Sequence, residues 1–318
     1  VAGALYLVLA LVVKLVGVKR VMRFLPPVVT GPIIICIGLS LAPSAVNNAK
    51  TNWILAIIAF AVIVIFNIWG KGMFKIIPIL MGVVISYVVA FILFKCGVHN
   101  PDGSAIFTFK AVKDAGWVDL PPFQLCKFNI TSILVMAPIA LATMMEHIGD
   151  ISAISATTGN NFIKDPGLHR SLFADNFSTM LSGMIGSVPT TTYGENIGVM
   201  AVTGVYSVRV IAGAAILSII CSFVGKLSAL ISTIPGPVIG GISFLLYGMI
   251  GTSGLRILVD SKVDYSKNRN QMLTSVIFVT GLSGAALRIG NIELTGMVLA
   301  CVVGMAMSLV FYVLDRLK

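Results

Sequence analysis

Long apolar stretches separated by short polar loops run through almost the whole chain. A helix needs about 20 mostly apolar residues to cross a lipid bilayer. Ten stretches approach that length: 1–18, 27–46, 53–69, 76–94, 130–156, 168–186, 208–232, 237–258, 272–286 and 294–314. The pattern therefore predicts an all-α polytopic membrane protein. The longest polar interval, residues 95–129, is expected to form an outer loop or linker.

One further segment, 189–207, is too short and too rich in Thr and Gly to face lipid. We expect a short strand or extended stretch there, leading into a broken half-helix that starts near Tyr193. Irregular backbone at membrane depth is tolerated only where protein buries it or where it lines a cavity. With this segment the chain has eleven predicted membrane segments, and 189–207 is the first candidate for a binding site.

Composition and charge agree with a membrane protein. The 318 residues are 57% hydrophobic and 11% charged, whereas soluble domains carry about 25% charged residues. The net charge of +10 does not indicate nucleic-acid binding, because the basic residues lie in short loops between spans. Every second loop is basic, so the positive-inside rule places those loops and the C-terminus in the cytoplasm. Cys96 and Cys126 bracket the outer loop, and their spacing leaves open whether they form a disulfide.

The sequence contains an internal repeat with a shift of 210 residues. Residues 1–7 (VAGALYL) match 211–217 (IAGAAIL), and without a gap 27–31 (PVVTG) match 237–241 (PVIGG). The two copies are seven segments apart, so they cross the membrane in opposite directions. Such inverted repeats are typical of secondary transporters, whose binding site lies at the repeat interface. Chance similarity between Gly-, Ala- and Val-rich spans is the alternative.

Two of the three glutamates lie at predicted membrane depth. A carboxyl there is costly unless it is paired, protonated or wet, which makes it a candidate functional group. Glu146 is four residues from Asp150, so both lie on one helix face, where two like charges favour protonation of one of them. Glu195 follows Gly194 at the start of the half-helix. The alternatives are structural carboxyls at Glu146 and Glu195 and a solvated helix-end charge at Asp150.

The start of the half-helix suits a flat polar ligand. Gly194 permits close approach to the backbone, and the first N–H groups of a helix have no partner within it. Tyr247, in another Gly-rich span, could stack on such a ligand or pack between helices, whereas His147 is expected to have a packing or interfacial role. The sequence has no Cys/His spacing typical of a metal site, no catalytic triad and no phosphate loop. We therefore predict neither an enzyme nor a cofactor or metal site.

Several motifs together resemble one transporter family. They are Glu146-His-Ile-Gly, Asp165-Pro-Gly-Leu-His-Arg, Thr191-Thr-Tyr-Gly-Glu-Asn-Ile-Gly-Val-Met, Pro237-Val-Ile-Gly-Gly-Ile-Ser-Phe-Leu-Leu-Tyr-Gly and Ser261-Lys-Val-Asp-Tyr. In this order they resemble the bacterial uracil permeases of the nucleobase/ascorbate family of cation symporters. The resemblance covers essentially the whole chain. Two positions depart from the family pattern: Asp150 stands where some relatives have His, and Thr190 stands where Asn is common.

The resemblance implies fourteen membrane segments in two inverted repeats of seven. This chain is similar to segments four to fourteen, so the first three spans would precede residue 1. The resemblance further implies a core domain of 1–18 and 130–232, a gate domain of 19–94 and 237–318, and a linker of 95–129. Members of the family are similar to elevator-type carriers and tend to dimerise through the gate domain.

The resemblance also implies roles for the residues singled out above. Glu146 would bind the edge of a uracil ring. Gly194 and Glu195 would contact the ring through their backbone, and Tyr193 and Tyr247 would complete the substrate-binding site.

The expected function is therefore proton-coupled import of uracil across the cytoplasmic (inner) membrane by an elevator-like mechanism. Proton coupling would involve Glu195, Asp150 and Glu146. The expected partners are uracil or a related nucleobase, protons, membrane lipid and a second copy of the chain, with no nucleic acid. A xanthine or urate permease is the alternative within this class. Outside it, an anion carrier on the same fold would need basic residues at the half-helix, and a non-transporting membrane scaffold would show no uptake.

Overall fold

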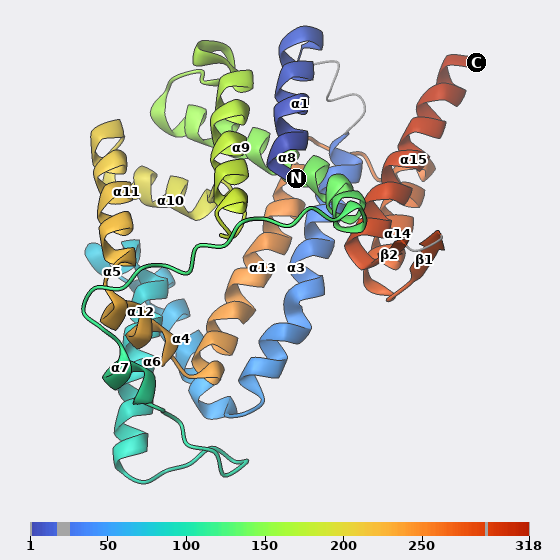
Figure 1. The fold of residues 1–318 in the computed structure, drawn as a ribbon. Coiled ribbons are helices and arrows are strands. Elements are labelled where there is room, and N and C mark those ends of the chain that lie inside the picture. The colour runs from blue at the N-terminus through green and yellow to red at the C-terminus, as the bar shows by residue number, and fades with distance from the viewer. Residues whose placement is uncertain (1, 18–25, 290–291, 318) are drawn as a thin grey trace. The chain divides into compact units, whose positions relative to one another are not determined.

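The computed structural model describes residues 2–17, 26–289 and 292–317, and nearly all of its regular structure is helical (Figure 1). Helices are present in all eleven segments predicted from the sequence, so the all-α architecture is confirmed. In chain order the elements are α1 (Ala2–Val16), α3 (Pro27–Ala49), α4 (Trp53–Trp69), α5 (Met73–Ile76), α6 (Pro78–Lys95), α7 (Lys110–Asp114), α8 (Ile130–Thr158), η1 (Ile163–Gly167), α9 (Leu168–Met184), α10 (Gly194–Thr203), α11 (Val208–Ser222), α12 (Gly225–Ser232), α13 (Gly236–Asp260), α14 (Asn268–Leu282), β1 (Ala286–Ile289), β2 (Ile292–Thr295) and α15 (Gly296–Leu317).

Several of these helices have the length and apolar character of membrane spans. Among the described residues, α3, α6, α13 and α15 each qualify by themselves. α11 and α12 qualify only as a pair, and they are bent by 86° relative to each other. α1 and α4 are apolar but have only 15 and 17 residues. The chain is thus a multi-pass membrane protein, and membrane crossing by the shorter or more polar helices stays a prediction.

The bend between α11 and α12 differs from the single span predicted for 208–232. The loop after α7 packs against this bend. There the Asp119 N–H donates to Phe223 O (2.9 Å), and a Cβ added to Gly225 would lie 2.7 Å from Gly116 O. A broken helix in a membrane requires that protein groups bind the backbone at the break. The loop provides such a group, which sequence periodicity could not reveal.

The chain folds as two compact units. The first contains residues 1–40, 123–198 and 249–318, and the second contains 41–122 and 199–248. This division reflects packing within each unit. The core and gate domains expected from the family resemblance concern relative movement, and they stay a prediction.

In the first unit, α1 packs along α9 and α8 (Figure 1). Gly3 brings the backbones of α1 and α9 together, because a Cβ there would lie 2.6 Å from Asn176 O and 2.8 Å from Met180 N. The buried core of this group consists of Tyr6, Ala10, Val13, Met144, Ile148, Leu168 and Leu172. α9 is therefore packed closely against a neighbouring helix.

The first unit also contains a β-hairpin that follows α14 and packs against α15 (Figure 1). Its strands β1 and β2 are antiparallel, with Ala286 paired to Thr295. The apolar pattern predicts helical spans over 272–286 and 294–314 and gives no sign of the hairpin. α14 instead starts earlier and ends before Gly284, whose φ of +73° favours glycine over other residues.

The stretch before α10 is also partly different from the prediction. The half-helix is confirmed, since α10 begins at Gly194. The short strand expected within 189–207 is not formed, because residues 187–193 pair with no strand in the described part of the chain. Hydroxyl groups of α9 instead donate hydrogen bonds to carbonyl groups of this stretch.

In the second unit, α4 packs against α6. The loop after α6 is anchored by Phe107, which is 4% exposed. The Phe107 ring lies edge-on to Tyr87, with centroids 4.9 Å apart, and stacks on Phe109, with centroids 5.2 Å apart. The polar insert predicted at 95–129 is thus a loop fastened by aromatic packing, with the short helix α7 within it.

Candidate functional site

The two acidic residues of α8 lie at the centre of the candidate site. α8 runs without a break from Ile130 to Thr158, so Glu146 and Asp150 are one turn apart on one helix face. Both side chains are half-buried. Asp150 is close to the start of α10, because a Cβ added to Gly194 would lie 3.4 Å from Asp150 Oδ1. The structure thus brings together predicted site residues from two separate helices.

The first turn of α10 supplies the second half of the site. The Asn196 N–H donates to Tyr193 O (3.1 Å), so the helix starts directly after the extended stretch. The N-terminal end of a helix carries a partial positive charge, which favours a nearby carboxylate or an oxygen of a ligand. A flat molecule bound here would meet backbone N–H groups of α10 and carboxyl groups of α8.

The other predicted site residues are placed less completely. The Tyr193 side chain is 64% exposed and thus accessible. The Glu195 side chain, predicted to couple protons, lies outside the described part of the chain. Tyr247 is half-buried on α13 and belongs to the second unit. The structure therefore assembles Asp150 and Gly194 with Glu146 one turn away, and the roles of all these residues stay predictions.

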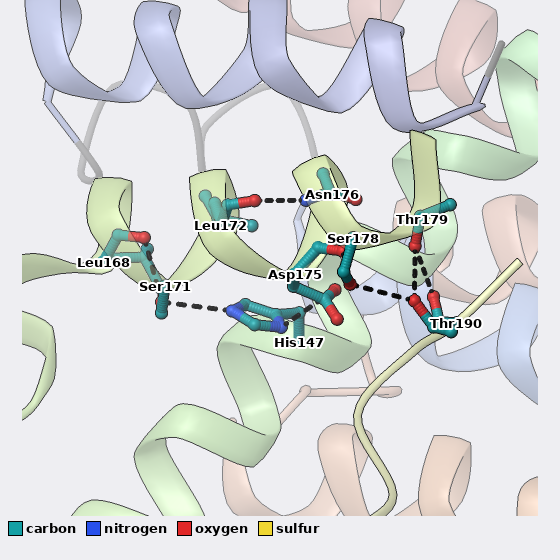
Figure 2. Close-up of polar contacts among 9 residues, drawn as sticks. All are labelled: His147, Leu168, Ser171, Leu172, Asp175, Asn176, Ser178, Thr179 and Thr190. Carbon is teal, nitrogen blue, oxygen red and sulfur yellow. Dashed lines mark hydrogen bonds and ion pairs between the residues drawn. The ribbon is translucent and has the colours of Figure 1, made fainter. Parts of the chain in front are cut away.

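Figure 2 shows a second polar cluster, which starts at the residue after Glu146. His147 is 3% exposed; its Nε2 lies 3.1 Å from Ser171 Oγ and its Nδ1 lies 3.6 Å from Asp175 Oδ2. The Ser171 hydroxyl donates to Leu168 O (3.0 Å), so Nε2–H donates to Ser171. Nδ1 then faces the carboxyl group, and this contact is favourable when either partner carries an additional proton.

This cluster links α8 to α9 and was only partly anticipated. The packing role expected for His147 agrees with its burial, but its polar partners were missed. An Asp on a helix of mixed polarity, such as Asp175, gives no signal until α8 is known to lie beside α9. Tyr6 of α1 is buried and lies within electrostatic reach of Asp175 and Glu146. Among the described residues, no group of three His, Cys, Asp or Glu side chains is suited to hold a metal ion.

α9 also binds the extended stretch that precedes α10 (Figure 2). The Thr179 hydroxyl donates to Thr190 O (2.7 Å), and the Ser182 hydroxyl donates to Val188 O. The Ser178 Oγ lies 3.1 Å from the Thr190 hydroxyl. α9 therefore contacts both halves of the candidate site, through His147 of α8 and through the stretch that leads to Gly194.

Comparison with known proteins identifies the family. A family model described as Permease family (Xan_ur_permease) matches residues 1–290. The chain is 42% identical to the uracil permease of Paenibacillus larvae, over 100% of this chain and 76% of that protein. It is also 42% identical to the uracil permease of Bacillus subtilis, over 97% of this chain and 73% of that protein. The identity to the uracil permease of Escherichia coli is likewise 42%, over 99% of this chain and 74% of that protein. These relatives are transporters, not enzymes, and their names agree with the resemblance seen in the motifs. The chain therefore belongs to the Permease family of multi-pass membrane transport proteins.

Proposed function

We propose that this permease imports uracil together with protons. The observation that carries the substrate assignment is the 42% identity to uracil permeases along the whole chain. The approach of Asp150 to Gly194 supports it, since a carboxyl group lies there near the first turn of α10, whose N–H groups have no partner within the helix. A xanthine or urate permease is the alternative, and it would need space for a second ring.

Uracil matches the chemistry of these groups. Its edge carries two carbonyl acceptors and two N–H donors. In the proposed complex the backbone N–H groups of Gly194 and Glu195 donate to a carbonyl oxygen, and the Glu146 carboxyl binds the ring edge. Buried polar groups lose free energy when they are left unpaired, so a ligand that pairs both sets is favoured over one that pairs half of them. Tyr193 and Tyr247 complete the proposed site.

Proton coupling would give a neutral substrate a driving force. Moving one charge across 100 mV is worth about 2.3 kcal/mol, which corresponds to an accumulation of about 50-fold. Glu195, Asp150 and Glu146 are the proposed proton carriers. Substrate release would follow loss of the proton on the cytoplasmic side.

The proposed transport cycle moves a core domain against a gate domain, as in elevator-type carriers. Its setting is the cytoplasmic membrane, with the C-terminus inside and a dimer formed through the gate domain. The inverted repeat in the sequence supports alternating access, because two copies of opposite orientation can exchange their conformations.

Uptake of radiolabelled uracil into proteoliposomes with an imposed inward proton gradient tests this function. We expect uptake that a protonophore abolishes and that excess unlabelled uracil, but not xanthine or urate, inhibits. Glu146→Gln should weaken uracil binding about tenfold or more, as expected for loss of a hydrogen bond to a charged group. Asp114→Asn, at an exposed position of α7, serves as the control and should transport normally.

The possible outcomes separate the parts of the proposal. Uracil uptake that does not depend on the proton gradient would contradict proton coupling, but it would still support transport of uracil. Inhibition by xanthine but not by uracil would favour the alternative substrate. Absence of binding to any nucleobase would contradict the assignment altogether.

A further inference from the structure

Among the described residues, the stretch between α9 and α10 lacks backbone hydrogen-bond partners of its own at several positions. Residues 187–193 have no regular structure, yet they lead to the proposed binding site at Gly194. Unpaired backbone groups at membrane depth are costly, so another element must bind them. The carbonyls of Val188 and Thr190 are bound by hydroxyl groups of α9.

The hydrogen-bond directions within this contact are determined. The Ser178 hydroxyl donates to Asp175 O (2.7 Å), and the Thr179 hydroxyl donates to Thr190 O (2.7 Å). The Thr190 hydroxyl, which lies within 3.1 Å of both α9 oxygens, therefore acts as the donor to one of them. Thr190 is thus bound to α9 by its carbonyl and by its side chain.

Thr179 is well placed to fix the stretch because it lies on the packed part of α9. The residue is 7% exposed. α9 packs against α1 at the neighbouring turn, where Gly3 brings the two backbones into contact. Sites supported by packed helices are more precise than sites on loops, because packing limits the freedom of their side chains.

After Thr190, the next buried hydroxyl of the stretch is that of Thr192. In an extended chain, residues two apart point to the same side. The Thr192 Oγ1 is buried, and no hydrogen-bond partner lies within reach of it among the described residues. This buried hydroxyl is thus left for water or a substrate, and Gly194 follows two residues later.

We propose that Thr179 is a positioning residue for the substrate site. By holding the Thr190 carbonyl, it sets where the first turn of α10 lies relative to Asp150 on α8. This inference rests on the proposed function. It extends that function to a residue that need not touch the substrate. In this proposal, α9 fixes the position of the start of α10 relative to α8.

The test compares Thr179→Val, which keeps the shape but removes the donor, with Thr179→Ser, which keeps the donor. The purified protein is assayed for uracil affinity, for KM and maximal rate of uptake, and for unfolding temperature. We expect Thr179→Val to raise the Kd and KM about 3- to 10-fold, as for the loss of one hydrogen bond. Thr179→Ser should remain close to the unchanged protein, which a purely steric role would not explain.

Two controls distinguish positioning from general destabilisation. Thr157→Val makes the same chemical change on α8, where the hydroxyl donates only to Ala153 O of its own helix (2.9 Å). Gly254→Ala lowers stability through packing elsewhere and should leave the Kd unchanged. If Thr179→Val does not fold, Ser182→Ala removes a separate bond from α9 to the stretch, at the Val188 carbonyl, and should also raise the Kd.

The results distinguish this inference from the proposed function. If the unchanged protein binds uracil and Thr179→Val binds it equally well, only the positioning role is overturned. The same holds if Thr157→Val or Gly254→Ala loses as much affinity as Thr179→Val. If the unchanged protein binds no nucleobase at all, both proposals are overturned.

Discussion

At the residue scale, Gly194 is the position where the absence of a side chain matters most for the proposed binding site. It begins α10, and an added Cβ would lie 3.4 Å from Asp150 Oδ1, which is ordinary contact distance. The protein by itself would therefore accommodate an alanine at this position. The same methyl group would occupy the space through which a flat ligand approaches the backbone of α10. We therefore expect any requirement for glycine at this position to come from the proposed ligand and not from the fold.

At this scale we expect Gly194→Ala to keep its unfolding temperature and to lose uracil affinity about tenfold or more, a typical penalty for one methyl group in a tight site. Gly213→Ala on α11 is the matched control, because a Cβ there meets no atom within 4 Å. Isothermal titration and thermal unfolding measure the two effects. Unchanged uracil affinity in Gly194→Ala would rule out close approach of the substrate to this backbone.

At the scale of elements, small residues decide how closely helices pack in a membrane. Within the first unit, α3 and α13 approach so closely that a Cβ added to Gly254 would lie 2.5 Å from Gly31 O and 2.8 Å from Ile35 N. These are backbone atoms, which cannot rotate away. Within the second unit, a Cβ added to Gly240 would lie 2.9 Å from Ala45 O.

Gly254→Ala should therefore destabilise the protein by about 1–3 kcal/mol, the usual cost of overpacking. Gly251→Ala, one turn earlier on α13, is the matched control because a Cβ there meets no atom within 4 Å. It should be neutral or slightly stabilising, since alanine favours helix more than glycine does. Thermal unfolding in detergent distinguishes the two variants, and equal unfolding temperatures would contradict the close packing of α3 and α13.

At the scale of the whole molecule, the distribution of charge predicts the orientation in the membrane. Basic residues lie between α13 and α14 and at the start of α14, where Lys262, Lys267 and Arg269 are close together in the sequence. The loop after α6 is expected on the opposite, outer side of the membrane. The positive-inside rule thus places residues 261–267 in the cytoplasm and residues 97–109 outside.

Single cysteines introduced after replacement of the five native ones test this orientation. Ala105→Cys and Ser261→Cys both place the thiol at an exposed position. A membrane-impermeant maleimide should label Ala105→Cys in intact cells and Ser261→Cys only after permeabilisation. The reverse labelling pattern would invert the predicted topology and place the C-terminus outside.

Much of this protein follows from the sequence because membrane helices are specified locally. A span needs a run of apolar residues regardless of its neighbours, so the apolar pattern locates ten segments. The Thr- and Gly-rich composition of 189–207 indicates the eleventh, which contains the start of α10 near Tyr193. Helical periodicity by itself likewise places Glu146 and Asp150 on one face of α8. The family motifs then indicate which segments matter for transport.

Contacts between segments were decided only by the tertiary structure. The approach of Asp150 to Gly194, the link from His147 to Asp175 and the bonds from Thr179 to Thr190 each join different elements. At the 86° bend between α11 and α12, the Phe223 carbonyl likewise accepts a hydrogen bond from Asp119, in a loop that is distant in the sequence. Local periodicity carries no information about such partners, because a hydroxyl or carboxyl has the same sequence signal whether or not another helix lies beside it.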